Sequence, residues 1–410
     1  MAQIFHLFDV FGIELEYMIV CRENLSVFPI SDQLIKKVAG EFLTEVEVDE
    51  IAWTNELVLH VIELKTNGPA KQLEPLTHFF HKNIKRINTI LLEFNAQLLS
   101  TAAHPFMDPD VEAKLWPHGD KTIYETYNKI FNCQGHGWSN LQSMHINLPF
   151  ANDEEFFKLH SAIRLLLPLM PALAASTPIL EGKITDFVCS RMNFYIKNQE
   201  RIPAITGKLI PEVVRSRKEY EEKILNPMYD AIRPYDPEGI LADEWLNSRG
   251  AIARFDRNAI EIRVLDVQES PKADIAICGL ITTVLKSLVN QQWINIKEQC
   301  ELTEEQLLEI FLEIIKSGQA TPIKNSHYLK CFGYTKKSTC TAGELWEHLF
   351  HQVMEKLDPS WLEPLQIILK EGNLAERIIK RLGNQFTREE IMSVYRELAN
   401  CLAENQLFRI

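Results

Sequence analysis

The sequence predicts an α+β fold in which an antiparallel sheet is followed by a helical C-terminal region. Strand-like apolar patterns dominate the first part of the chain. Helical patterns lie between them, but without the regular strand–helix alternation of a parallel sheet. After about residue 290 only helical patterns remain. We therefore expect one domain over residues 1–290, which holds the sheet, and a helical region over residues 291–410, either a separate small domain or a support packed against the sheet.

The elements follow in order along the chain. Apolar or alternating patterns predict strands within residues 4–20, 45–51, 57–64, 144–150, 252–255 and 259–267. Apolar residues three or four positions apart predict a helix from Leu73 to Leu98, and a second helix is expected over residues 156–173. In the last part, Thr303 to Gln306 and Thr387 to Glu390 have the form of capping boxes, each before an apolar helix.

Charge and composition exclude several classes of protein. The 410 residues include 43 Lys and Arg against 56 Asp and Glu, a net charge of −13, which argues against nucleic acids and anionic membranes as partners. The most apolar run, residues 165–180, is too short to span a membrane and is interrupted by prolines. The N-terminal residues lack a basic segment, and the eight cysteines form no CxxC pair, so we expect a cytoplasmic protein with free thiols. A homo-oligomer is compatible with these features.

Pairs of charged side chains recur on strand-like segments. Glu14 and Glu16 are two residues apart, so a strand places both on one face, with Ile13, Leu15 and Tyr17 on the other. One such pair is also what a half-exposed strand with a polar outer face would show. The pattern recurs, however, in three later segments, which makes a shared polar patch the stronger interpretation.

Each of the three later segments adds polar groups. Glu56 and Glu63 are seven residues apart, so they converge only if the chain bends between them. Ser143, His145 and Asn147 share one strand face, and so do Glu261 and Arg263. Carboxylates gathered by a sheet would repel one another unless a divalent cation bound them, and this ligand set suits Mg²⁺ or Mn²⁺. The fixed charge of Arg263 would suit a phosphate.

Four segments occur in an order that resembles a known family. They are GIELE at 12–16, NELVLHVIELKT at 55–66, QSMHIN at 142–147 and AIEIRVLD at 259–266. In these segments the chain resembles the carboxylate–amine ligases of glutamate–cysteine ligase family 2, distant relatives of glutamine synthetase. HPF at 104–106, STPILEGKITDFVCSR at 176–191 and RIPAITGKLIPE at 201–212 also look like this family. The last two stretches look more like a branch whose substrates are unassigned.

The resemblance implies a bowl-shaped antiparallel sheet of the glutamine synthetase type that holds ATP and two or three Mg²⁺ ions. The metal ligands carried over are Glu14, Glu16, Glu56, Glu63, His145 and Glu261. Arg263, together with Glu261, would act in catalysis by contacting the γ-phosphate or the acyl phosphate. Arg191, Gln142 and Asn147 would contact substrate, with a surface salt bridge as the alternative for Arg191.

The implied reaction joins the carboxylate of an amino acid to an amine through an acyl phosphate. Glutamate is the expected acid and cysteine one candidate amine. Two alternatives remain open: a metal-dependent phosphotransferase or hydrolase on the same fold, and an inactive binding protein. The sequence has no P-loop, no GxGxxG and no HExxH motif. ADP release that requires both acid and amine would distinguish the ligase from the alternatives.

Overall fold

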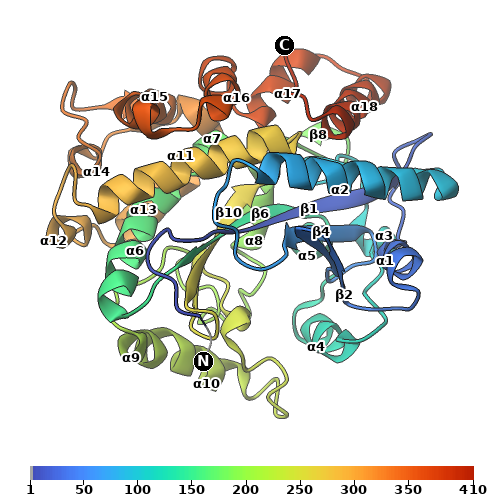
Figure 1. Cartoon of the computed structure of the whole chain (residues 1–410), viewed down its shortest axis with the longest axis horizontal. Helices are drawn as coiled ribbons and strands as arrows, with labels where there is room; N and C mark the ends of the chain where they lie inside the picture. The colour runs from blue at the N-terminus through green and yellow to red at the C-terminus, as the bar shows by residue number, and fades with distance from the viewer. Residues whose placement is uncertain (1–2) are drawn as a thin grey trace.

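The computed structural model describes residues 3–410 and contains an eight-stranded sheet in which every pairing is antiparallel. Seven strands follow the order β2 (Glu45–Val48), β3 (Ile51–Asn55), β4 (Val61–Thr66), β1 (Gly12–Cys21), β6 (Ser143–Pro149), β10 (Ala259–Asp266) and β9 (Ala251–Arg254). The eighth strand, β5 (Ala96–Leu99), pairs with the far end of β1. The α+β fold class is confirmed, with an antiparallel sheet that has helices packed against it (Figure 1).

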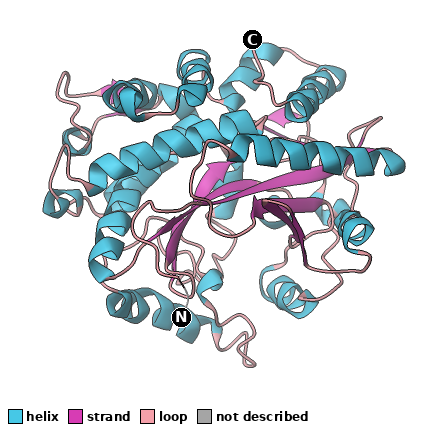
Figure 2. Ribbon diagram, in the orientation of Figure 1, coloured by secondary structure: helices cyan, strands magenta, loops and turns pink. Residues whose placement is uncertain are grey.

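One face of the sheet forms the core. Ile13, Leu15, Ile146 and Ile262 are fully buried on this face, beneath the long helices α2 (Leu76–Leu91), α6 (Asp153–Leu166) and α11 (Pro271–Val289). Figure 2 shows these helices on one side of the sheet, and loops with shorter helices on the other. The apolar alternation of the strands therefore fixes which face is covered and leaves the opposite face for polar side chains.

Helix α11 is buried almost along its whole length because it is covered from two sides. Cys278 contacts Met144 of β6, with 3.4 Å between their sulfur atoms. On another side Gly279 lies against Trp361 of α16 (Pro359–Glu371), where an added Cβ would come within 2.4 Å of the ring. Only glycine permits this close approach of the two helices. Helix α11 thus connects the sheet with the C-terminal helices.

The C-terminal region is helical, with one small exception. Its helices are α12 (Ile296–Gln299), α13 (Glu304–Ser317), α14 (Ser326–Cys331), α15 (Ala342–Val353), α16, α17 (Leu374–Leu382) and α18 (Arg388–Glu404). Both expected capping boxes are confirmed, at the starts of α13 and α18. The exception is a pair of two-residue strands, β11 (Pro322–Ile323) and β12 (Cys340–Thr341). Trp346 of α15 donates to the carbonyl of Leu169, so this region packs against the preceding one. The domain boundary at residue 290 stays a prediction.

Several expected elements have different limits in the structure. The strand expected over residues 45–51 ends at Val48, and a separate strand, β3, begins at Ile51. The helix expected from Leu73 to Leu98 was wrong at its end: α2 stops at Leu91, and Asn95 turns the chain with a φ of +54° into β5. The strand expected over residues 57–64 begins only at Val61. Pro168 and Pro171 divide the helix expected over 156–173 into α6, a 3₁₀ turn and α7 (Pro171–Ala174), because proline cannot donate within a helix.

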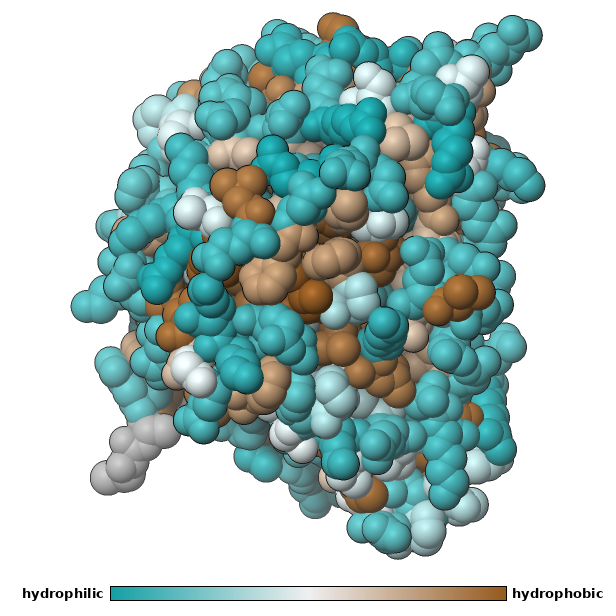
Figure 3. All heavy atoms as spheres, turned by 90° about the vertical axis from the view of Figure 1, so that its right-hand side faces the viewer, coloured by the Kyte–Doolittle hydropathy of each residue, from teal (hydrophilic) through white to brown (hydrophobic). Residues whose placement is uncertain are grey.

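The remaining helices of the first 290 residues are short. They are α1 (Ser31–Ala39), α3 (Pro109–Glu112), α4 (Lys121–Phe131), α5 (His136–Ser139), α8 (Ser190–Tyr195), α9 (Arg217–Tyr220) and α10 (Asn226–Ile232). Among the described helices, none is both long enough and apolar enough to cross a bilayer. All eight cysteines are free thiols, as expected. Figure 3 shows one face of the molecule, where apolar residues gather at the centre of a largely hydrophilic surface.

His160 of α6 is buried in an apolar part of the core. Its side chain lies 5.2 Å from the ring of Phe156 and 6.0 Å from that of Tyr220, measured between ring centroids. Neither of its ring nitrogens has a hydrogen-bond partner among residues 3–410. Burial, with the nearby charges of Arg164 and Arg249, lowers the pKa of His160 to about 3. The folded protein therefore strongly favours the neutral imidazole.

We expect His160 to make the protein sensitive to acid. Its pKa is about 6.5 in an unfolded chain, so its contribution to stability is complete above pH 6.5 and is lost as the pH falls towards the folded pKa of about 3. In urea unfolding, the wild type should lose stability between pH 7 and pH 4. In His160→Phe this loss should be smaller by about 3 kcal/mol. His78→Phe, at an exposed position, is the control. Equal pH dependence in the wild type and His160→Phe would contradict this account.

Candidate active site

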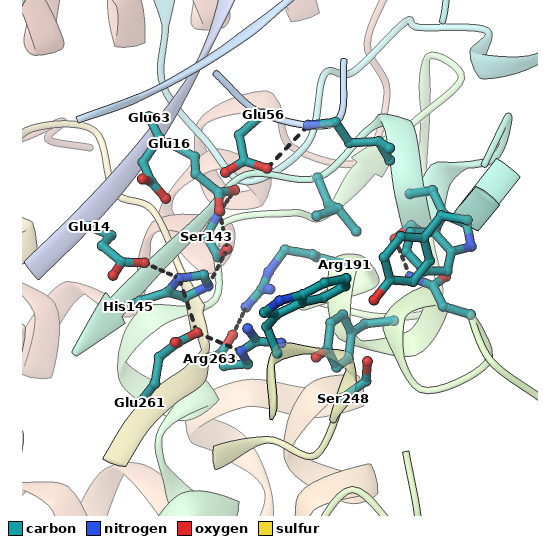
Figure 4. A pocket seen from close by; sticks show the side chains of 18 of the residues that line it. Glu14, Glu16, Glu56, Glu63, Ser143, His145, Arg191, Ser248, Glu261 and Arg263 are labelled. Atoms are coloured by element: carbon teal, nitrogen blue, oxygen red, sulfur yellow. Dashed lines mark hydrogen bonds and ion pairs between the residues drawn. The ribbon is translucent and has the colours of Figure 1, made fainter. Parts of the chain in front are cut away.

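A cavity of about 460 Å³ opens on the polar face of the sheet. Its lining comes from β1, β4, β6, β9 and β10, and from loops and short helices that cover this face. All six expected metal ligands line it, together with Arg263 and Arg191. Figure 4 shows the carboxylates of Glu14, Glu16, Glu56 and Glu63 directed towards one region of the cavity, with Arg263 and Arg191 beside them. The four segments that were expected to converge therefore do so.

Strand register explains how β1 and β6 place their polar groups together. Glu14 pairs with His145 across the two strands, and their side chains meet with 2.8 Å between Glu14 Oε2 and His145 Nδ1. Ser143 holds the next carboxylate: its backbone N–H and its hydroxyl donate to Glu16 at 2.6 and 2.9 Å. Asn147 donates to Glu14 at 3.0 Å. Each β1 carboxylate is thus fixed by β6.

Glu63 lies on β4 directly opposite Glu16 of β1, and Thr54 of β3 donates to it at 2.6 Å. Glu56 reaches the same place because the chain bends at residue 57 and turns at residues 59–60 before β4 begins. The bend required by the spacing of seven is therefore present as a turn. Two groups of possible ligand atoms result, each within 4.8 Å: Glu14, Glu63 and His145, and Glu16, Glu56 and Glu63. Glu63 belongs to both groups.

Burial and mutual repulsion perturb the ionisation of these groups. Burial, reinforced by the charges of Glu14 and Glu16, raises the pKa of Glu63 to about 8. Burial, with the charges of Glu16 and Glu63, also raises the pKa of Glu56 well above its usual value. Without a cation, the cluster therefore retains protons at neutral pH. A set of close carboxylates with one imidazole fits Mg²⁺, which would replace these protons.

Glu14 and His145 form the ionised pair of the cluster. Burial works against charge on Glu14, but its hydrogen bond with His145 and the positive charge there lower the pKa of Glu14 to about 2. Burial likewise disfavours charge on His145, yet the hydrogen bond and charge of Glu14, with the charge of Glu261, raise the pKa of His145 to about 9. A metal bound here would have to displace the proton of His145.

Glu261 and Arg263 enter the cavity from β10, where the register with β6 shifts between Ile262 and Leu265. Arg263 Nε donates to Glu261 Oε1 at 2.6 Å, and its Nη1 donates to the carbonyl of Asn247 at 3.3 Å. Glu261 lies 3.8 Å from His145 Nδ1. Its carboxylate is therefore paired with an arginine at the edge of the acidic cluster.

Arg191 of α8 is held by a buried acid. Its Nε donates to Asp266 Oδ1 at 2.6 Å, and both side chains are almost fully buried. Asp266 Oδ2 accepts from the backbone of Ser176 at 2.9 Å and from the Thr177 hydroxyl at 3.0 Å. The alternative of a surface salt bridge for Arg191 is wrong. Its guanidinium is instead fixed in the wall of the cavity.

Gln142 and Asn147 do not line the cavity. Gln142 lies immediately before β6 and is fully buried. Its backbone N–H donates to the carbonyl of Ala102, but its side-chain amide has no hydrogen-bond partner within residues 3–410. Asn147 lies beside the cluster and supports Glu14. Substrate contacts by these two residues stay a prediction.

Several residues that line the cavity were not identified from the sequence. Lys65, two positions after Glu63 on β4, could have been found from strand alternation. Arg254 lies at the end of strand β9. Other lining residues come from loops and short helices, which carry no periodic signal, among them Arg257, Tyr124, Tyr127, Trp138, Tyr195, Trp245 and Ser248.

Comparisons with known proteins agree on one family. The model of glutamate-cysteine ligase family 2 matches residues 10–397. An uncharacterized protein of Archaeoglobus fulgidus is 34% identical over 94% of this chain and 96% of its own length. A protein of Enterobacter sp. named "Putative glutamate--cysteine ligase 2" is 23% identical over 72% of each chain.

A solved structure has the same fold. The crystal structure of glutamate–cysteine ligase from Francisella tularensis in complex with AMP aligns with a TM-score of 0.58 at 14% identity. The alignment covers 96% of this chain and 89% of that one. The antiparallel sheet with its helical layer is therefore shared along nearly the whole length of both chains.

Proposed function

This chain belongs to glutamate-cysteine ligase family 2, and on that premise we propose that it is an ATP- and Mg²⁺-dependent carboxylate–amine ligase. The expected acid is glutamate or a similar amino acid, and the product is an amide formed through an acyl phosphate. One observation carries the proposal: two groups of acidic ligand atoms share Glu63 inside one cavity, beside Arg263.

The acidic cluster would hold Mg²⁺ through Glu14, Glu16, Glu56, Glu63 and His145, with Glu261 at its edge. Bound Mg²⁺ would neutralise charge on the phosphates of ATP during phosphoryl transfer. The raised pKa values of Glu56 and Glu63 support this assignment, because carboxylates that cannot all ionise together are the groups a cation would stabilise.

Two arginine side chains would stabilise the negative charge that remains on the phosphates and on the substrate carboxylate. Arg263 is placed to stabilise the transferred phosphoryl group and then the acyl phosphate, because its guanidinium is fixed by Glu261 and by the carbonyl of Asn247. Arg191, anchored on Asp266, would bind the substrate carboxylate or a phosphate. The reaction needs no nucleophilic serine or cysteine, since positioning and electrostatic stabilisation suffice.

The product test separates this activity from the two alternatives. Purified protein is incubated with ATP, Mg²⁺, glutamate and a panel of amines, while ADP release is followed and the products are identified by mass spectrometry. A ligase releases ADP efficiently only when acid and amine are both present, and an amide of the expected mass appears. ADP release with no amide would instead indicate a phosphotransferase or hydrolase, and no turnover with any pair would favour a binding protein.

Ligand binding should stabilise the folded protein. At a concentration one hundred times Kd, ATP with Mg²⁺ adds about 2.7 kcal/mol to the free energy of unfolding. Differential scanning fluorimetry should therefore show a higher melting temperature with both ligands than with ATP plus EDTA. An unchanged melting temperature at saturating concentrations of both would contradict the proposed nucleotide site.

A further inference from the structure

Three aromatic rings form a wall on the cavity, which we call the aromatic wall: Tyr127 of α4, Trp138 of α5 and Trp245 of a 3₁₀ turn at Glu244–Leu246. The ring centroid of Tyr127 lies 5.4 Å from that of Trp138 and 5.8 Å from that of Trp245. All three side chains are only partly buried and line the cavity. Aromatic surface left open inside a polar cavity is suited to an apolar or aromatic group of a ligand.

The aromatic wall lies beside the reacting end of the cavity. Arg263 donates to the carbonyl of Asn247, two residues after Trp245, so this arginine is bonded to the segment that carries the wall. The charge of Arg263 also opposes the rise that burial causes in the pKa of Tyr127. Two parts of the wall are therefore close to the guanidinium that, in the proposed function, stabilises the acyl phosphate.

This position argues against adenine as the occupant of the wall. Two further phosphates and the ribose separate the adenine ring of ATP from the γ-phosphoryl group that Arg263 would contact. The group beside the acyl phosphate is instead the attacking amine. A positively charged ligand group stacked on the rings is also disfavoured, because Arg263 would repel it.

We propose that the amine substrate of this protein carries an aromatic ring that packs against Tyr127, Trp138 and Trp245. The inference rests on the proposed ligase function and names the class of its second substrate. The neutral amine attacks the acyl carbon and forms the C–N bond. The C–O bond to phosphate breaks, inorganic phosphate leaves with the electron pair, and the nitrogen releases one proton to solvent. Phenylalanine and 2-phenylethylamine each combine a primary amine with an aromatic ring, so both are suitable probes.

The test compares matched amines at saturating ATP, Mg²⁺ and glutamate. We expect kcat/KM for phenylalanine or 2-phenylethylamine to exceed that for alanine or cysteine by at least tenfold. The two aromatic probes distinguish an amino acid from a simple amine. Trp245→Ala should lower kcat/KM for the aromatic amine at least tenfold more than it lowers kcat/KM for alanine. Tyr235→Ala, at an exposed ring outside the cavity lining, is the matched control.

Three outcomes would overturn the inference. The first is equal kcat/KM for phenylalanine, alanine and cysteine. The second is a rise in KM for ATP in Trp245→Ala with unchanged amine preference, which would assign the wall to adenine. The third is the absence of binding when 2-phenylethylamine is titrated calorimetrically into protein that holds ADP and Mg²⁺. Heat of binding that is lost in Trp245→Ala, without ADP release for any pair, would uphold the aromatic site and reject the ligase function.

Discussion

Glu63→Gln is expected to lower ATP turnover by at least a hundredfold while the apo protein stays as stable as the wild type. Glu63 is the carboxylate common to both groups of ligand atoms, so its loss weakens both. Removing one preorganised electrostatic group of a catalytic site costs about a hundredfold to a thousandfold in rate. The fold should survive because burial and the neighbouring acids raise the pKa of Glu63 to about 8, so glutamine resembles the protonated side chain already present.

The measurement pairs ADP release with thermal unfolding of the metal-free protein. Glu47→Gln is the matched control, since Glu47 is an exposed glutamate on β2 of the same sheet; it should leave turnover unchanged. A Glu63→Gln variant with normal turnover would remove the basis for a metal site at this cluster. A melting temperature far below that of the wild type would show instead that Glu63 is needed for folding.

Arg377→Met is expected to destabilise the protein by about 3–5 kcal/mol, the usual cost of leaving one partner of a buried ion pair uncompensated. Arg377 of α17 is fully buried and donates to Glu269 at 2.7 Å and to the carbonyl of Gly372 at 3.1 Å. It also donates to the carbonyl of Phe408. This one side chain therefore links the end of the C-terminal region to the segment between β10 and α11.

Urea unfolding provides the measurement, and the same helix provides the control. Arg381 of α17 pairs with Glu397 at 2.9 Å, but both side chains are exposed, so Arg381→Met should change stability by less than about 1 kcal/mol. Combining Arg377→Met with Glu269→Leu should recover much of the loss, because no buried charge is then left unpaired. Equal effects of the two arginine variants would contradict a structural role for the buried pair.

Local periodicity was enough to predict the strands that build the site. A spacing of two residues placed Glu14 and Glu16 on one face, and the structure has both in the cavity with Leu15 buried behind them. Period alone could not give the register that places His145 opposite Glu14, because register depends on contacts between distant segments.

Other parts of the fold and the site depend on local turns of the backbone, which leave only weak patterns in the sequence. Leu98 continued the helical spacing of apolar residues, but the left-handed turn at Asn95 ends the helix and places Leu98 in strand β5. The convergence of Glu56 with Glu63 required a turn that the continuous apolar run between them conceals. The aromatic wall comes from α4, α5 and a 3₁₀ turn, so no periodicity in the sequence could have grouped its rings.

Strand β2 closes one end of the sheet, and among the described strands it pairs only with β3. Its outer border presents a row of backbone groups that could template a strand from a second molecule, and the exposed carboxylate of Glu47 disfavours such pairing by charge repulsion. Replacing Glu47 by valine should therefore promote intermolecular β-aggregation that starts at this border while the interior of the protein stays folded.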